Sequence, residues 1–211
     1  MSEDMLGLSV LQAGVQSSLQ DLGRFGHADQ GISQGGAMDL HAHCWSNKLL
    51  GNDPDCAVLE LTVGMAKFRA ESDMQLALAG ADMQAELNGV RVGNWRSFFV
   101  QAGDEISLKA ASDGMRAYLA VAGGFLVHEC LGSVSTVVRN GLGGMDGSGS
   151  LLGVGDFLAV GESTGDRGVR QVPERYIPRY GESIELRVIQ SYQSEEFASD
   201  ELAKLYQGGM C

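Results

Sequence analysis

Glycine is the residue that most constrains this chain: 30 of its 211 residues are glycine, and only three are proline. The glycines follow no collagen-like period and lie in no low-complexity run. Glycine adopts backbone conformations that other residues avoid, so such a chain can make many tight turns. Short strands joined by tight turns are typical of all-β barrels and sandwiches. We therefore predict a mainly β protein.

Several segments alternate apolar and polar residues, as half-buried strands do. The predicted strands and hairpins cover Cys56–Thr62, Met74–Gly80, Met83–Gly93, Ser97–Ala110, Met115–Gly124, Phe157–Gly161 and Ile184–Ile189. Asn88-Gly89 predicts a hairpin turn inside the third of these segments, and Ser97–Ala110 predicts a second hairpin.

Helix signals are few. An apolar stripe predicts a helix over Met38–Leu50, and Gly51 stands where a glycine commonly ends a helix. A second helix is predicted over Ser194–Tyr206, with Ser194 as its N-cap.

The charge and the cysteines exclude several classes of function. The formal net charge of −12 argues against nucleic acid and anionic membrane surfaces, because both bind basic patches. The four cysteines form no C-x-x-C pair, and we predict no metal site. The first residues, MSEDML, lack the basic start and apolar run of a signal peptide. We expect a cytoplasmic protein with reduced thiols.

The segment Ser17–Asp39 is the first place to look for a ligand site. It sets Gln20, Asp21, Arg24 and Asp39 among five glycines, and a glycine-rich loop with fixed polar side chains often frames a ligand. In such a loop Arg24 would present its planar fork to a carboxylate. Asp39 precedes the first predicted helix, so it serves either as a helix cap or in the site.

Two further groups of polar residues are candidates. Glu60 lies in an apolar strand with Thr62 facing the same side, so this carboxylate either faces solvent or is held in a polar site. The hydroxyls of Gly132–Thr136 either line a pocket or satisfy the backbone of a turn.

Two other patterns are interpreted as structural. His41 and His43 point to different faces of a helix, which favours surface or packed histidines over a metal site. Leu142–Gly155 is rich in glycine but lacks the G-x-x-x-x-G-K-[ST] pattern of a phosphate-binding loop, so we predict tight turns. Glu162–Glu182, with mixed charge and two prolines, is the candidate linker.

Several motifs occur in one order along the chain. They are LQDLGRFGHADQGISQGGAMD, SNKLLGND, AVLELTVG, AYLAVAGGF, GSVST, LGG and GVGD. Together they resemble the biotin-dependent carboxyltransferase family, also called the allophanate hydrolase subunit 2 family, from Leu8 to about Leu205. That family includes the C subunit of 5-oxoprolinase, and a related region forms part of the carboxyltransferase domain of urea carboxylase.

The resemblance implies a fold and a domain division. The fold would be a cyclophilin-like β-barrel with few short helices, built as two related halves. Residues 1–165 would form the first half, residues 166–182 a linker, and residues 183–211 the start of a second half that is incomplete in this chain.

The resemblance also implies a function. The chain would be part of a bacterial ATP-dependent 5-oxoprolinase, which opens the lactam of 5-oxoproline to glutamate. Its partners would be a paralogous B-like subunit and a third, A-like subunit. One alternative is a biotin-dependent carboxyltransferase acting on urea or a related amide. Another is a non-catalytic regulatory module that binds the B-like partner.

The site residues implied by the resemblance combine with those from the patterns above. The expected catalytic residues are Asp21, Arg24 and Glu60, and the expected substrate-binding residues are Gln20, Gly36, Asp39, Asn47, Thr62, Ser133 and Thr136. Two positions depart from the family, with Met65 in place of a common Pro and Val134 in place of a common Arg. The second change weakens anion binding by the Gly132–Thr136 loop. No ATP motif is present, so the nucleotide is expected on a partner or at an interface.

Overall fold

The computed structural model describes residues 6–163, 168–181 and 187–207. The chain divides into two compact units, Met1–Tyr180 and Gly181–Cys211.

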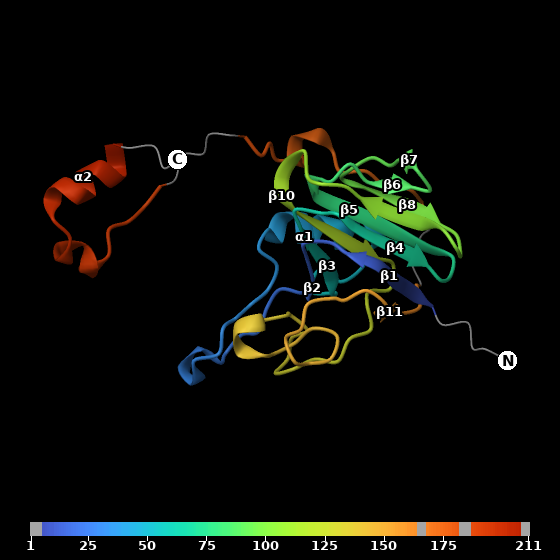
Figure 1. Cartoon of the computed structure of the whole chain (residues 1–211), viewed down its shortest axis with the longest axis horizontal. Helices are drawn as coiled ribbons and strands as arrows, with labels where there is room; N and C mark the ends of the chain where they lie inside the picture. Colours follow the sequence, from blue (N-terminus) through green and yellow to red (C-terminus); the bar gives the residue numbers. More distant parts are fainter. Residues whose placement is uncertain (1–5, 164–167, 182–186, 208–211) are drawn as a thin grey trace. The chain divides into compact units, whose positions relative to one another are not determined.

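Unit 1 is built from two antiparallel sheets (Figure 1). The six-stranded sheet has the order β11 (Phe157–Ala159), β1 (Gly7–Ala13), β4 (Ala66–Ala70), β9 (Glu105–Leu108), β6 (Glu86–Leu87) and β7 (Val90–Arg91). The five-stranded sheet has the order β2 (Gln16–Gln20), β3 (Val58–Thr62), β10 (Asp113–Val121), β5 (Met74–Asp82) and β8 (Arg96–Val100). The prediction of a mainly β protein with few short helices is confirmed. The described strands form two open sheets rather than one closed barrel.

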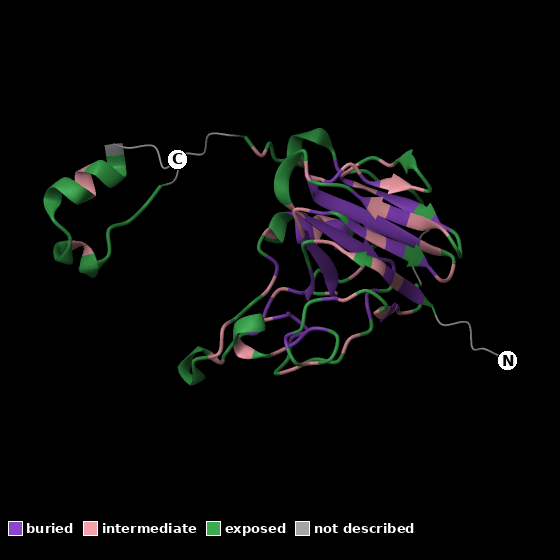
Figure 2. Ribbon diagram, in the orientation of Figure 1, coloured by how far each residue is buried: buried purple, intermediate pink, exposed green. Residues whose placement is uncertain are grey.

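The main core lies between the two sheets. Successive side chains of a strand point to opposite faces, so every second residue contributes to this core. The six-stranded sheet supplies Leu8 and Phe68, and the five-stranded sheet supplies Leu19, Leu59 and Leu119, all of them buried. Figure 2 shows the burial concentrated on these strands.

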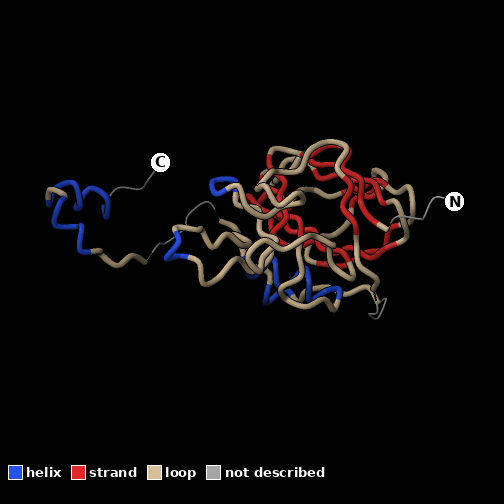
Figure 3. Tube along the Cα trace, turned by 90° about the horizontal axis from the view of Figure 1, so that it is seen from below, coloured by secondary structure: helices blue, strands red, loops and turns tan. Residues whose placement is uncertain are grey.

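The outer face of the five-stranded sheet is covered by α1 (Leu40–Leu50). The Asp39 carboxylate accepts a hydrogen bond from the Ala42 N–H (3.0 Å), and Gly51 ends the helix with a φ of 75°. Leu49 and Leu50 pack with Val58 and Ala120 in a second apolar cluster. The predicted first helix is therefore confirmed. Figure 3 shows the strands of unit 1 gathered together, with the helical turns of unit 1 outside them.

The hairpin predictions have opposite outcomes. Asn88 and Gly89 have φ values of 50° and 81° and join the paired strands β6 and β7, as predicted. The hairpin predicted over Ser97–Ala110 is wrong, because β8 pairs with β5 whereas β9 pairs with β4 and β6. A tight turn held by the hydrogen bond from Asp104 N–H to the Gln101 carbonyl (3.0 Å) carries the chain from one sheet to the other.

The remaining described segments of unit 1 are loops and short 3-10 turns. The 3-10 turns are η1 (Ala28–Gln30), η2 (Val138–Asn140) and η3 (Glu174–Tyr176). Leu142–Gly155 contains no strand or helix, as predicted. Within the predicted linker, Val172 is buried and its N–H donates to the Trp95 carbonyl (2.9 Å). Residues 168–180 therefore pack as part of unit 1, and the start of a second half stays a prediction.

Unit 2 contains η4 (Tyr192–Glu196) and α2 (Ser199–Gln207). The predicted second helix is thus shorter than Ser194–Tyr206, because Ser194 lies inside the 3-10 turn that Ser191 caps. Residues 184–186 of the strand predicted over Ile184–Ile189 lie outside the described residues, and Arg187–Ile189 are not in a strand. Across the described part of the chain, no helix combines the length and apolar character needed to cross a membrane.

Candidate functional site

Two rows of polar side chains cross three strands of the five-stranded sheet on its outer face. In one row Gln16, Thr62 and Arg116 are direct neighbours in the register of β2, β3 and β10. The next row places Ser18, Glu60 and Tyr118 in the same way. Their neighbours along each strand point into the core between the sheets, so these residues face the side on which α1 packs. We call these six residues the polar rows.

Glu60 is held firmly within the polar rows. Its Oε2 accepts hydrogen bonds from the Tyr118 hydroxyl (2.7 Å) and from the Met38 N–H (2.9 Å). Its Oε1 lies 3.4 Å from Nε of Arg116. Glu60 is buried, so of the two readings that the sequence leaves open the polar site holds and the solvent-facing side chain does not.

Tyr118 connects this carboxylate to the backbone of Asp39. Its hydroxyl donates to Glu60 and accepts the N–H of Asp39 (2.7 Å). Asp39 in turn accepts the hydroxyl of Tyr180 (2.9 Å) through Oδ2 while Oδ1 caps α1. Burial and then the nearby charge of Glu60 raise the pKa of Tyr118 well above its usual value, so this phenol stays protonated and acts as a donor. Asp39 is therefore both a helix cap and a neighbour of the site.

Asp21 forms a separate polar centre that clamps a distant segment. Its Oδ1 accepts the Ser133 hydroxyl (2.8 Å), the Ser135 hydroxyl and the Gly23 N–H (2.8 Å). Its Oδ2 accepts the Val134 N–H (2.7 Å). With four donors on one buried carboxylate, Asp21 fixes the backbone of residues 133–135.

Arg24 strengthens the same clamp. Its Nε donates to the Cys130 carbonyl (2.7 Å), and its Nη2 donates to the carbonyls of Ser133 (3.1 Å) and Ser135 (3.3 Å). The side chain is 2% exposed, and Nη1 is buried without a hydrogen-bond partner in the structure. The sequence predicts that the guanidinium group of Arg24 faces a ligand, but in the structure it donates hydrogen bonds to backbone carbonyls of residues 130–135.

Gln20 lies between the two centres. It is the last residue of β2, and its Nε2 donates to the Ser18 hydroxyl (3.1 Å) and to the Thr136 carbonyl (3.2 Å), while its buried Oε1 has no partner in the structure. Thr136 donates its hydroxyl to the Leu19 carbonyl (3.0 Å). Of the expected site residues, Glu60 and Thr62 belong to the polar rows with Asp39 beside them, Asp21, Arg24 and Ser133 form the clamp, and Gln20 and Thr136 lie between the two groups.

Two expected site residues have clear structural roles. Asn47 on α1 is fully buried and donates to the Cys56 carbonyl (2.8 Å), which ties the helix to the start of β3. Gly36 has a φ of 92°, and a Cβ there would lie 2.8 Å from the Leu22 carbonyl oxygen. Only glycine fits that position without strain, because the chain segments approach closely there.

His43 is a buried polar residue that the sequence assigns only to packing. It is fully buried on α1, its ring stands edge-on to Tyr118 with centroids 6.2 Å apart, and neither ring nitrogen has a hydrogen-bond partner in the structure. Burial lowers its pKa, and the charges of Asp21, Asp55 and Glu60 oppose that shift only partly. No pattern in the sequence distinguishes it from His41, which is exposed.

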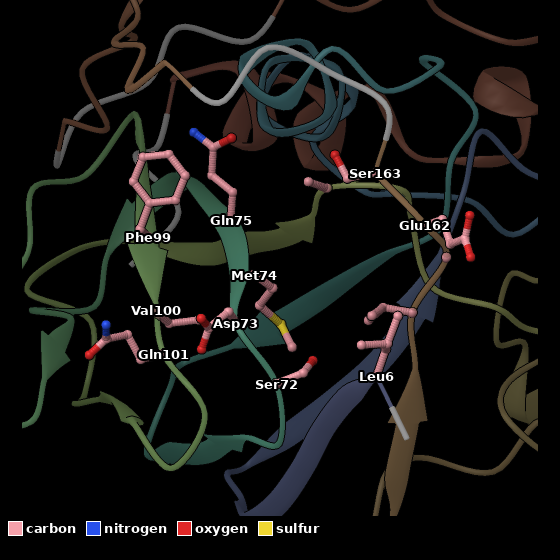
Figure 4. Close-up of a pocket in the computed structure, with 13 residues that line it drawn as sticks. Leu6, Ser72, Asp73, Met74, Gln75, Phe99, Val100, Gln101, Glu162 and Ser163 are labelled. Carbon is pink, nitrogen blue, oxygen red and sulfur yellow. The ribbon is translucent and has the colours of Figure 1, made fainter. Parts of the chain in front are cut away.

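The cavities of unit 1 lie away from most of these residues. One of about 480 Å³ opens beside the start of β5 and the end of β8, where Met74, Phe99 and Val100 line it together with Glu162 (Figure 4). None of the expected site residues lines this cavity. Another, of about 390 Å³, includes Asp21 in its wall. The described residues contain no group of three or more His, Cys, Asp or Glu side chains placed to hold a metal ion.

The glycine-rich loop Leu142–Gly155 does not fit a nucleotide phosphate. Several of its N–H groups are already used: Gly149 donates to the Gly143 carbonyl (2.8 Å) and Gly144 to the Val134 carbonyl (2.9 Å). The Asp146 carboxylate lies within the loop and accepts the Ser148 N–H (2.9 Å). A phosphate needs free N–H donors and positive charge; this loop contains no Lys or Arg, and several of its N–H groups are already hydrogen-bonded.

Comparison with known proteins gives consistent matches. The model of the family described as "Carboxyltransferase domain, subdomain A and B" matches residues 30–209. The chain is 42% identical over 171 residues to the C subunit of the 5-oxoprolinase of Escherichia coli (strain K12), covering 78% of this chain and 54% of that protein. It is 33% identical over 175 residues to the protein of that name in Haemophilus influenzae, covering 82% and 56%.

A solved structure also matches. The crystal structure of the Kluyveromyces lactis urea carboxylase superposes with a TM-score of 0.79 at 28% sequence identity, over 86% of this chain and 17% of that one. The chain spans about half the length of the two curated relatives.

Proposed function

This chain belongs to the family of the carboxyltransferase domain, subdomains A and B, and from that premise we propose that it is one component of a 5-oxoprolinase-type complex. The observation that carries the proposal is its 42% identity to the C subunit of the E. coli 5-oxoprolinase. The complex would open the lactam of 5-oxoproline to glutamate with ATP, together with a paralogous B-like subunit and an A-like subunit. Residues 183–211 would begin a second half related to the first.

The chemistry that such a complex must perform is hydrolysis of an unreactive amide. Water adds to the lactam carbonyl carbon, the bond from that carbon to nitrogen breaks, and the nitrogen takes up a proton as the amine of glutamate. ATP would transfer its γ-phosphoryl group to the carbonyl oxygen, so that breaking the carbon–nitrogen bond leaves an acyl phosphate, and a second water would release phosphate and the glutamate carboxylate. We assign the nucleotide to a partner protein or to an interface with one, because the sequence carries no ATP motif. This chain would hold the substrate and keep bulk water away.

The polar rows are the part of the chain that we propose for this task. Glu60 would take the proton of the attacking water and return it to the leaving nitrogen, because it is a buried carboxylate fixed by Tyr118 and Met38. Thr62 and Gln20 would contact the substrate from the same sheet face. Asp21 and Arg24 would act as the frame, through the clamp on residues 133–135.

Reconstitution tests this proposal. The chain is mixed with its B-like and A-like partners, ATP and 5-oxoproline, and glutamate is measured. We expect glutamate only when all three proteins are present, and a large loss with Glu60→Gln. Tight binding to the B-like partner without any glutamate would favour a regulatory module and refute the enzyme proposal.

The second candidate is a biotin-dependent carboxyltransferase acting on urea or a related amide. The superposition on the Kluyveromyces lactis urea carboxylase favours it. It would need biotin on a separate domain, because the chain has no A-M-K-M-type biotin acceptor motif. Consumption of carboxybiotin that depends on urea would support this candidate over the first.

A further inference from the structure

We propose that Arg116 binds the carboxylate group of a small acidic substrate that also carries an amide, which is 5-oxoproline under the proposed function on which this inference rests. Arg24 cannot fill that role, because its Nε and Nη2 are hydrogen-bonded to backbone carbonyls and its side chain is almost fully buried. Arg116, by contrast, lies in the polar rows, is partly exposed and has a carboxylate, that of Glu60, beside its guanidinium group.

Arg116 sits where the polar rows open toward solvent. It follows Met115 on β10, and its direct neighbour across β3 is Thr62, beyond which lies Gln16 on β2. Exposure rises from one row to the other: Ser18 and Glu60 are buried, whereas Thr62 is half-buried and Gln16 is exposed. A ligand approaching the buried Glu60 along this face therefore meets Arg116 first.

The guanidinium of Arg116 has one engaged side and one open side. Its Nε is buried, has no hydrogen-bond partner in the structure and lies 3.4 Å from Oε1 of Glu60. The side chain as a whole is 28% exposed. The contact that its Nη1 makes among the described residues is with the Met115 sulfur at 3.9 Å, which is a weak acceptor.

This arrangement prepares the group for a planar anion. Glu60 fixes the inner edge of the guanidinium by charge, so its orientation is set before a ligand arrives. The remaining N–H donors form the flat fork that pairs with both oxygens of a carboxylate.

The charge around Arg116 limits which anion can bind. Glu60 lies beside it, and Asp39 is linked to Glu60 through Tyr118. These carboxylates would repel a doubly charged phosphate more strongly than a singly charged carboxylate, and the whole chain carries a net charge of −12. The hydroxyl of Thr62 and the amide of Gln16, on strand neighbours about 5 Å apart along the row, suit the N–H and C=O of a lactam.

The test is a binding measurement on the full chain with two ligands that differ in charge. Isothermal titration compares 5-oxoproline with 5-oxoprolinamide, which keeps the lactam and lacks the carboxylate. We expect the wild-type chain to prefer the acid, and Arg116→Gln to lower affinity for the acid by about tenfold or more while affinity for the amide stays unchanged. Arg116→Lys keeps the charge without the fork, so it should fall between the two.

Arg91→Gln is the matched control. Arg91 is also a strand arginine paired with a carboxylate, Nη2 lying 2.7 Å from Asp82, but it belongs to the six-stranded sheet. The same substitution there should leave both affinities unchanged. Thermal unfolding of each variant checks that it is folded, and Arg116→Gln should remain folded because Glu60 keeps its hydrogen bonds from Tyr118 and Met38.

Two results would overturn the inference: no preference for the acid in the wild-type chain, or an equal preference in Arg116→Gln. The outcome is separable from that of the proposed function. If the reconstituted complex makes glutamate and Arg116→Gln leaves its KM for 5-oxoproline unchanged, the proposed function stands and the role of Arg116 fails. If the preference for the acid depends on Arg116 but the reconstituted complex forms no glutamate, the role of Arg116 stands and the proposed function fails.

Discussion

Replacing Asp21 with alanine should remove the frame of the site rather than a catalytic group. The substitution leaves the buried N–H groups of Gly23 and Val134 and the hydroxyls of Ser133 and Ser135 without their acceptor. A buried donor left unsatisfied costs about 1–3 kcal/mol. The two hydroxyls can rotate toward other acceptors, but the two N–H groups cannot.

The expected loss is therefore about 3–5 kcal/mol in the free energy of unfolding, most of it from the two N–H groups. Urea denaturation followed by circular dichroism measures this loss. Limited trypsin digestion adds a local readout, because Arg139 follows the clamped segment and should be cut faster in Asp21→Ala.

The matched control is Asp29→Ala, the same substitution at an exposed residue of the same segment, which should change stability by less than about 0.5 kcal/mol. If Asp21→Ala unfolds within about 1 kcal/mol of wild type while the reconstituted activity is lost, the clamp is not structural and Asp21 acts on the substrate.

Three more variants test other parts of the molecule. Burial lowers the pKa of His43 below its ordinary 6.5. The neutral ring therefore contributes its full stability above that pH, and this contribution is lost as the pH falls, because the unfolded chain takes up the proton first. In His43→Leu the urea midpoint should fall less between about pH 7.5 and about pH 5 than it does in the wild-type chain. Tyr118→Phe removes the hydroxyl that donates a hydrogen bond to Glu60, and urea denaturation should show a loss of about 1–3 kcal/mol in the free energy of unfolding. An unchanged urea midpoint would contradict the role of this hydrogen bond. Gly36→Ala should lower the melting temperature much more than Gly26→Ala, because both have positive φ but only the first Cβ meets a backbone oxygen.

Local patterns predict the parts of the fold that depend on local chemistry. The first helix follows from its apolar stripe, with Asp39 and Gly51 at its ends, and the hairpin follows from Asn88-Gly89. The pairing of β8 and β9 with different sheets does not follow, because strand partners depend on residues far away in sequence. The strand β2 is also missed, since Gln16–Gln20 carries mostly polar side chains, although all of them except Gln16 are buried.

The candidate site shows the same division. The sequence singles out Glu60 because a carboxylate in an apolar strand either faces solvent or is held in a polar site, and the structure supplies Tyr118 as its partner. It assigns Arg24 to a ligand because glycines surround it, whereas in the structure the carbonyls of Cys130 and Ser133 accept hydrogen bonds from its Nε and Nη2. Arg116 attracts no notice in the sequence, because its role depends on the register between β10 and β3.

The clamp has a consequence for how the protein folds. Asp21 binds residues that lie 112 to 114 positions later in the chain, so its hydrogen bonds close a very large loop. Closing such a loop costs entropy that only a largely assembled tertiary structure can offset, and contacts of this kind slow folding. During synthesis the segment around Asp21 and Arg24 leaves the ribosome long before its partner exists. Both charged side chains must stay hydrated until residues 130–136 arrive, which places the completion of this part of the molecule late in folding.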